Sequence, residues 1–176
     1  TNLELLGGAL DPEEWQSISI SPLERIVNVA QTAFDMVLMD MGSQFSSDWN
    51  SVLLGARFVL LVTEADVPSL WTRDRRLRAL SGFGIPPERI RVVVNRAHKG
   101  DEETLKSIQS PVFGYLPNDF RKVSASVNFG TPLMENHDNA LTHRYREMAS
   151  RLTGGTLLPS AKRSGLSSLF TSSAKR

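Results

Sequence analysis

Residues 58–66 read Phe-Val-Leu-Leu-Val-Thr-Glu-Ala-Asp, an unbroken apolar run that ends in polar and acidic residues. Three other short apolar runs end in the same way, at 37–39, 90–94 and 112–116. Runs of this length, rich in Val, Leu and Phe and closed by a polar residue or Pro, are typical of strands buried on both faces of a parallel sheet. We therefore predict a strand at each run, with residues 3–6 as a candidate for a fifth.

Amphipathic segments alternate with these runs. Helices are predicted from Ser21-Pro22 onward, from about Ser46 to Ala56, from Asp66 or Ser69 to Leu80, and from about Asn139 to Leu152. Ser followed by Pro is a favoured helix start, and Gly after the last apolar position is a favoured end. Strands and helices that alternate in this way indicate βαβ units. The predicted class is α/β, with a mostly parallel sheet flanked by helices.

Composition excludes several classes of protein. The chain has 176 residues and no Cys, which excludes disulfide frameworks, iron–sulfur clusters, Cys-ligated zinc and thiol chemistry. No apolar run approaches the roughly 20 residues of a membrane-spanning helix. The chain starts at Thr1 without Met, so we expect it to be a fragment or a processed product. The absence of Cys is compatible with a reducing, cytoplasmic setting.

Charge divides the chain into two parts. Residues 1–150 hold 15 Lys+Arg and 19 Asp+Glu, a net charge of −4, whereas residues 151–176 hold five basic residues and no acid, a net charge of +5. The last stretch is also rich in Ser. We therefore expect one domain over residues 1–154 and a basic, mostly disordered tail over residues 155–176.

Polar residues at the strand ends are the first candidates for a binding site, because open α/β sheets bind ligands outside the carboxyl ends of their strands. Asp40 follows one run, and Gly42 lies two residues further on. Since Mg²⁺ prefers one or two carboxylates plus water, Asp40 is a candidate for holding the water shell of a phosphate-bound Mg²⁺. Gly42 would let its backbone amide approach a γ-phosphate. The alternative is that Asp40 merely caps the next segment.

Two further strand ends offer a different chemistry. Asn95-Arg96 combines an amide, which can read the edge of a purine, with a guanidinium, which can stack on a ring. Asn also suits a turn after any strand, so the pair alone leaves both interpretations open. Pro117-Asn118-Asp119 is similarly either part of a site or the start of a helix.

Other motifs point less clearly to function. One predicted helix carries Arg73, Arg75, Arg76 and Arg78, which we interpret as a solvated face; a phosphate-binding patch is the alternative, without interleaved aromatic residues. His98, His137 and His143 lack the spacing of metal ligands. The phosphate-loop pattern G-x-x-x-x-G-K-[ST] and the pattern G-x-G-x-x-G are both absent from the sequence.

The order of these pieces resembles the MinD/ParA family of deviant-Walker ATPases. Residues 34–42 resemble that family's YD-hhhhD-x-G/P segment, and residues 58–66 its next strand with a V-T-E-x-D ending. Residues 92–96 are similar to its base-recognition strand. Residues 114–119 resemble the G-x-I-P-x-D strand end, and residues 123–133 the V-x-x-A-x-x-x-G-x-P-L segment that follows. The resemblance covers roughly residues 1–154.

Within that family, residues 3–10 and the Asn128-Phe129-Gly130 spelling look most like the CpaE/TadZ branch of bacterial pilus-assembly and polar-localisation proteins. The resemblance implies a P-loop NTPase-like fold of the SIMIBI/MinD type, with ATP and Mg as cofactors of the complete protein. It also implies a homodimer that sandwiches ATP between subunits and whose nucleotide state controls localisation.

The resemblance assigns roles to particular residues. Asp40 would be the Walker-B-like acid, bound through water to Mg, and Gly42 would lie by the γ-phosphate. Asn95 would contact the adenine. The residues expected near the base are Arg96, Pro117 and Asp119.

Two departures from the family pattern matter. The phosphate loop with its signature lysines normally precedes the region that begins at Thr1, so the fold is expected to be N-terminally incomplete and to bind ATP poorly or not at all. Met41-Gly42-Ser43-Gln44 also departs from the commoner acid-x-Pro-Pro spelling. A receiver-like domain is expected further upstream. Whether the chain takes part in ATP hydrolysis is therefore left open.

The tail suggests a contact with a surface. Leu166, Leu169 and Phe170 fall at i, i+3 and i+4 between basic residues, the pattern of a short amphipathic helix with weak membrane affinity; a solubilising tail is the alternative. Three functions follow from the sequence: an ATPase-type switch that places a pilus or secretion machine, a non-catalytic scaffold of the same fold, or a ParA-like DNA-partitioning protein. Nucleic acid is the least favoured partner. The expected location is cytoplasmic, at a pole or at the inner membrane.

Overall fold

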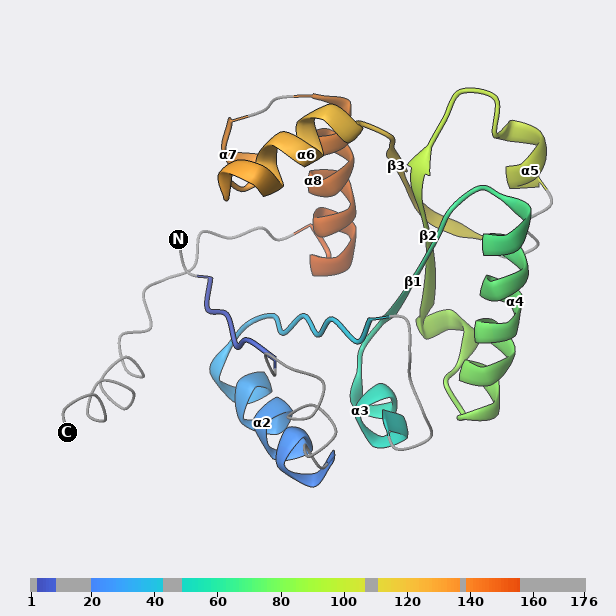
Figure 1. Cartoon of the computed structure of the whole chain (residues 1–176). Helices are drawn as coiled ribbons and strands as arrows, with labels where there is room; N and C mark the ends of the chain where they lie inside the picture. Colours follow the sequence, from blue (N-terminus) through green and yellow to red (C-terminus); the bar gives the residue numbers. More distant parts are fainter. Residues whose placement is uncertain (1–2, 9–19, 43–48, 107–110, 137–138, 156–176) are drawn as a thin grey trace.

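A parallel sheet of three strands forms the centre of the structure (Figure 1). The computed structural model describes residues 3–8, 20–42, 49–106, 111–136 and 139–155. Its strands are β1 (Val59–Thr63), β2 (Ile90–Ala97) and β3 (Val112–Pro117), in the order β1-β2-β3, and both pairings are parallel. The predicted α/β class with a parallel sheet is confirmed.

Helices lie before, between and after the strands, and the amphipathic pattern predicts the four over residues 20–33, 50–55, 67–82 and 140–153. The helices are α2 (Ile20–Ala33), α3 (Asn50–Gly55), α4 (Val67–Gly82), α5 (Glu102–Lys106), α6 (Phe120–Phe129), α7 (Leu133–Asn136) and α8 (Ala140–Thr153), with a 3₁₀ turn, η2, at Pro87–Arg89. The predicted starts near Ser21, Asp66 and Asn139 each lie within two residues of the observed ones. No helix among the described residues is long and apolar enough to cross a membrane.

Opposite faces of the sheet carry different helices. The adjacent residues Val93 and Val94 of β2 are both fully buried, but in different clusters, because successive side chains of a strand point to opposite faces. Val94 packs with Leu70 of α4, whereas Val93 packs with Leu141 of α8. The sheet is therefore covered by α4 on one face and by α8 on the other (Figure 1).

A third apolar cluster lies at the amino ends of the strands. Its buried members are Leu53, Leu80 and Ile85. Packed against them are the first residues of β1 and β2, Val59 and Ile90, together with Met41, Trp49 and Phe83. This cluster packs α3 and the end of α4 against the end of the sheet where β1 and β2 begin.

Two predicted strands do not form. Residues 37–39 are an extended segment outside the sheet, and the Leu38 side chain is 82% exposed. Residues 3–6 are likewise outside it, with Leu5 91% exposed. An apolar run becomes a strand only where another strand offers its backbone groups in register, and none of the described segments pairs with either run. Both predictions of a strand are therefore wrong for this structure.

Candidate functional site

The carboxyl ends of the three strands meet at one edge of the sheet. Thr63, Ala97 and Pro117 are the last residues of β1, β2 and β3. Beyond β3, the Asn118 N–H donates to the carbonyl of Ala97 at 3.1 Å, which extends the contact between the two strands. Two of the predicted segments, Asn95-Arg96 and Pro117 to Asp119, are therefore brought together at this edge.

A β-bulge shapes the end of β2. Val94 pairs with Tyr115 and Ala97 pairs with Pro117, so three residues along β2 match two along β3. Arg96 has φ = 52°, the only positive φ of a non-glycine residue in the described chain. Bulges are common beside binding sites because the extra residue redirects side chains. No local feature of the amino-acid sequence predicts this bulge.

An ion pair connects the ends of β1 and β2. Arg96 Nη1 lies 3.1 Å from Glu64 Oε1, and both side chains are largely exposed. Glu64 follows β1 directly, so its position at this edge agrees with the expectation for strand-end residues. The ion pair therefore holds the guanidinium of Arg96 next to the end of β1.

A second polar contact joins the loop after β2 to the turn after β3. Asn118 Nδ2 lies 3.2 Å from His98 Nε2, a hydrogen bond when the ring nitrogen is unprotonated. The His98 N–H donates to Asp101 Oδ2 at 2.7 Å. Sequence analysis considered His98 only as a metal ligand and missed this role. The signal available was its position one residue beyond β2.

Asp66 and Asp119, which follow β1 and β3, cap helices. Asp119 accepts from the Lys122 N–H at 3.3 Å at the start of α6 and pairs with Lys122 Nζ at 3.3 Å. Asp66 accepts from the N–H and the hydroxyl of Ser69, both at 2.8 Å, at the start of α4. The Ser69 backbone N–H, and then its hydroxyl, hold the pKa of Asp66 below its ordinary value. Asp119 thus stands at the start of a helix, which is one of the two possibilities that the sequence left open for Pro117-Asn118-Asp119.

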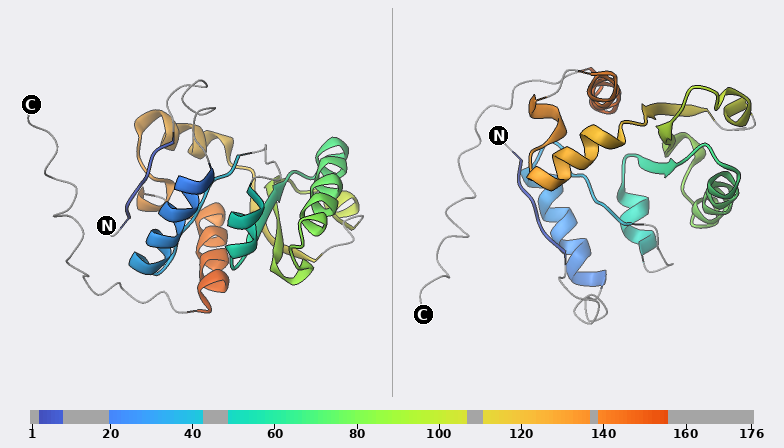
Figure 2. Two further views of the ribbon diagram at one scale, coloured as in Figure 1. Left: turned by 90° about the horizontal axis from the view of Figure 1, so that it is seen from below. Right: turned by 45° about the horizontal axis from the view of Figure 1, so that its top comes forward.

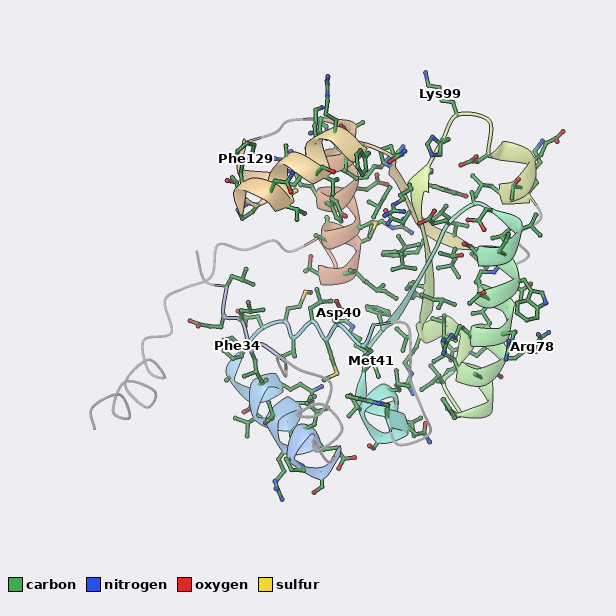
Figure 3. All side chains as sticks on the ribbon, in the orientation of Figure 1. Phe34, Asp40, Met41, Arg78, Lys99 and Phe129 are labelled. Carbon is green, nitrogen blue, oxygen red and sulfur yellow. The ribbon has the colours of Figure 1, made fainter. Side chains whose placement is uncertain are left out.

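Asp40 and Gly42 lie elsewhere. The Gly42 N–H donates to Asp40 Oδ1 at 2.9 Å, and Gly42 has φ = 61°, so the pair forms a local turn. Met41 packs on the cluster at the amino ends of β1 and β2. Figure 3 shows Asp40 and Met41 beside α3, far from Lys99 in the loop after β2. The structure therefore does not gather Asp40 and Gly42 with Asn95, Arg96, Pro117 and Asp119.

The separation of Asp40 from the carboxyl edge bears on the predicted contact with Mg. Asp40 is exposed, and no group of three or more His, Asp or Glu side chains in the described ranges could hold a metal ion. The described residues thus do not form a complete site for Mg and phosphates. The role of Asp40 toward Mg stays a prediction.

The arginines of α4 do not form one solvated face. Arg73 is 5% exposed, and its guanidinium pairs with Asp74 at 2.6 Å. Arg75 stacks on Trp71, with its guanidinium carbon 4.9 Å from the ring centroid. The prediction of four exposed arginines is wrong for Arg73, which lies one turn after buried Leu70 on the side facing the sheet. The expectation of no aromatic residue among these arginines is also wrong, because Trp71 lies under Arg75.

Comparison with known sequences finds two relatives of one kind. The septum site-determining protein MinD of Thermotoga maritima is 24% identical over 148 residues, which is 79% of this chain and 54% of that protein. MinD of Helicobacter pylori is 27% identical over 143 residues, 73% of this chain and 53% of that protein. The chain spans about half the length of these relatives. No family model matches it.

Solved structures show the same fold. A ParA family ATPase from Chlorobium tepidum gives a TM-score of 0.73 at 20% identity, over 80% of this chain and 61% of that one. MinD complexed with Mg-ADP from Pyrococcus horikoshii gives a TM-score of 0.66 at 17% identity, over 82% of this chain and 61% of that one. The MinC:MinD complex of Aquifex aeolicus gives a TM-score of 0.58 at 20% identity, over 86% of this chain and 62% of that one. The predicted resemblance is confirmed at the level of the MinD/ParA superfamily fold.

Proposed function

We propose that the carboxyl edge of this sheet is the base-binding side of an adenine-nucleotide site of the MinD/ParA type. The observation that carries the proposal is the bulge at the end of β2, which brings Asn95 and Arg96 to the same edge as Pro117. Among the relatives, the Pyrococcus protein is described as complexed with Mg-ADP. The shared fold supports a nucleotide as the ligand here.

Asn95 is the residue best suited to recognise the base. Its side chain is half-buried, and among the described residues it has no hydrogen-bond partner. An amide offers both a donor and an acceptor, the combination that the edge of an adenine requires. Arg96 is exposed and held by Glu64, so its guanidinium can lie over a ring bound at the edge.

The phosphate side requires groups outside this set. A phosphate loop presents several backbone N–H groups to the phosphates, and its sequence pattern is absent from these 176 residues. We propose that the loop is provided by a further segment, in the same polypeptide or in a partner. Asp40 would act toward Mg only after it moves to the carboxyl edge.

The biological role that we propose is a molecular switch that positions a pilus or secretion machine in the manner of the CpaE/TadZ branch. Its support is the motif order described above and the Asn128-Phe129-Gly130 spelling; the relatives found by comparison are named as cell-division proteins. A homodimer controlled by nucleotide, at a pole or at the inner membrane, belongs to the same proposal. Contact with the membrane would come through Leu166, Leu169 and Phe170, which lie outside the described residues.

The alternatives lead to a clear experiment. The first alternative is a non-catalytic scaffold, which would keep the fold without responding to nucleotide. The second is a DNA-partitioning protein, and burial of Arg73 weakens the case for DNA binding by α4. Sedimentation velocity on the product of the whole gene tests the switch. A shift from monomer to dimer with Mg-ATP, and none with Mg alone, is expected. An unchanged sedimentation coefficient would favour the scaffold.

A further inference from the structure

An apolar groove lies between α6, α7 and α8. It has a volume of about 550 Å³ and is lined by Val123 of α6, Leu133 and Met134 of α7, and Tyr145 and Ala149 of α8. The three helices stay together in all views (Figures 1 and 2). The volume is within the range of sites that take a ligand or a few side chains.

The apolar surface continues beyond the groove along α6. Phe120 and Val127 lie three residues before and four residues after Val123, so the three share one face of the helix. Phe120 is 76% exposed and Val127 is 73% exposed. Contiguous exposed apolar surface of this kind commonly marks a place where another segment binds.

Helix α8, which forms one wall of the groove, ends in two left-handed glycines. Gly154 and Gly155 have φ = 73° and 83°, and the Gly155 N–H donates to the Ser150 carbonyl at 2.7 Å. This arrangement is a Schellman-type ending, in which a left-handed residue reverses the direction of the chain. The C-terminal segment is therefore tethered to α8, the helix that forms one wall of the groove.

The length of the remaining chain is sufficient. Ala149 lies six residues before Gly155, about 9 Å along the helix axis. Leu166 lies eleven residues after Gly155, and eleven residues can span up to about 36 Å. A tethered segment so close to its site has an effective concentration of about 1 mM, so weak apolar contacts are enough to hold it.

We propose that Leu166, Leu169 and Phe170 of the chain's own C-terminal segment dock into the groove between α6, α7 and α8. Their i, i+3, i+4 spacing forms one apolar face on a helix, and an amphipathic helix laid in an apolar groove is a common mode of recognition. The attraction is apolar, because residues 156–176 have no acid and the groove carries the cation Arg146. The same three residues would contact a membrane, so docking and membrane contact exclude each other.

Cysteine cross-linking in the full chain tests this proposal, because the chain has no native Cys. Ser168→Cys is combined with Ala149→Cys in the groove or with Glu147→Cys, which faces away from it on the same helix at a similar distance from the tail. Under mild oxidation, we expect the intramolecular disulfide to form about tenfold faster with Ala149→Cys. A second groove position, Met134→Cys, covers the case in which Ala149→Cys disturbs the fold.

The outcomes separate the possible occupants. Leu169→Ser with Phe170→Ser should remove the difference between the two pairs, whereas 0.5 M NaCl should not. Equal rates for the groove and control pairs would overturn the proposal. Disulfides that form only between two chains would also overturn it and assign the groove to a second copy.

Discussion

The guanidinium of Arg96 lies 3.1 Å from the carboxylate of Glu64, and this ion pair connects the end of the bulged strand β2 to the end of β1. Arg96 reaches this position with a left-handed backbone, φ = 52°. Because the left-handed region costs a residue with a Cβ roughly 1–2 kcal/mol, the bulge is held by the strand pairing around it and not by the preference of Arg96. The backbone therefore keeps the Arg96 side chain at the candidate site.

Substitution of Arg96 separates the backbone cost from the ion pair. Arg96→Gly removes the strain and loses an exposed pair worth less than about 1 kcal/mol, so its free energy of unfolding should equal or exceed that of the parent. Arg96→Val loses the same pair but adds a β-branched side chain to a left-handed position, and should be less stable than Arg96→Gly by about 1–2 kcal/mol. Urea unfolding measures both. Equal stability of the two variants would contradict the assigned backbone.

Gly114 of β3 is in close contact with α8. A Cβ built at Gly114 would lie 2.6 Å from Met148 Sδ and 2.9 Å from Met148 Cγ. Gly114→Ala should therefore destabilise the fold by about 1–3 kcal/mol, and Met148→Ala in the same chain should recover part of that loss. Gly82→Ala is the matched control, because a Cβ there meets nothing within 4 Å. If both glycine variants unfold at the same urea concentration, α8 does not pack on β3 as described.

Because the charge of Arg73 on α4 is buried, substitutions of Arg73 and of its partner Asp74 should affect stability differently. Arg73 is buried, and its Nη1 has no hydrogen-bond partner. Arg73→Met should be neutral or stabilising, since an apolar side chain of similar size removes a desolvated charge. Asp74→Ala should cost about 1–3 kcal/mol, because it leaves the guanidinium buried without its carboxylate; the half-exposure of Asp74 lowers the value expected for a fully buried pair. The two differences in unfolding free energy should thus have opposite signs or very different sizes.

Asp66 should make the start of α4 sensitive to acid. The Ser69 N–H and hydroxyl lower the pKa of Asp66 in the folded state. Its contribution to stability is therefore fully present above the ordinary pKa of an aspartate, about 3.9, and is lost as pH falls through the lowered folded value. A carboxyl ¹³C titration should show the lowered pKa in the parent and a partial return in Ser69→Ala. An unchanged titration in Ser69→Ala would remove the hydroxyl from the explanation.

Local pattern was enough to predict most elements but not their complete assembly. β1, β2 and β3 were predicted because each is a short apolar run closed by polar residues, and α4 and α8 because caps stand at their starts. Residues 37–39 have the same local pattern as β1, yet strand formation depends on a neighbouring strand, and this is a property of the whole sheet. The same limit explains why Asp40 was expected at the carboxyl edge and is not found there.

The parts of the site that escaped prediction depend on contacts between distant residues. Neither the bulge at Asn95-Arg96 nor the Asn118–His98 contact has a local signature, because each depends on how β2 and β3 are aligned. Burial of Arg73 depends on which side of α4 meets the sheet. Asn95, Arg96, Pro117 and Asp119 lie at one edge because strand ends in a parallel sheet converge there, and their role in binding stays a prediction.

We propose that Asn95 and the carboxyl edge recognise adenine. We would titrate the 176-residue chain with adenosine, which needs no phosphate loop, and follow backbone amide shifts by ¹⁵N NMR, with cytidine as the control ligand. Adenosine should shift the amides of residues 95–98 and 117–119 with a dissociation constant of about 1 mM or weaker, cytidine should not, and Asn95→Ala but not Asn28→Ala on the exposed face of α2 should abolish the effect. Shifts that are absent from this edge, or that are equal for cytidine or in Asn95→Ala, would contradict the account.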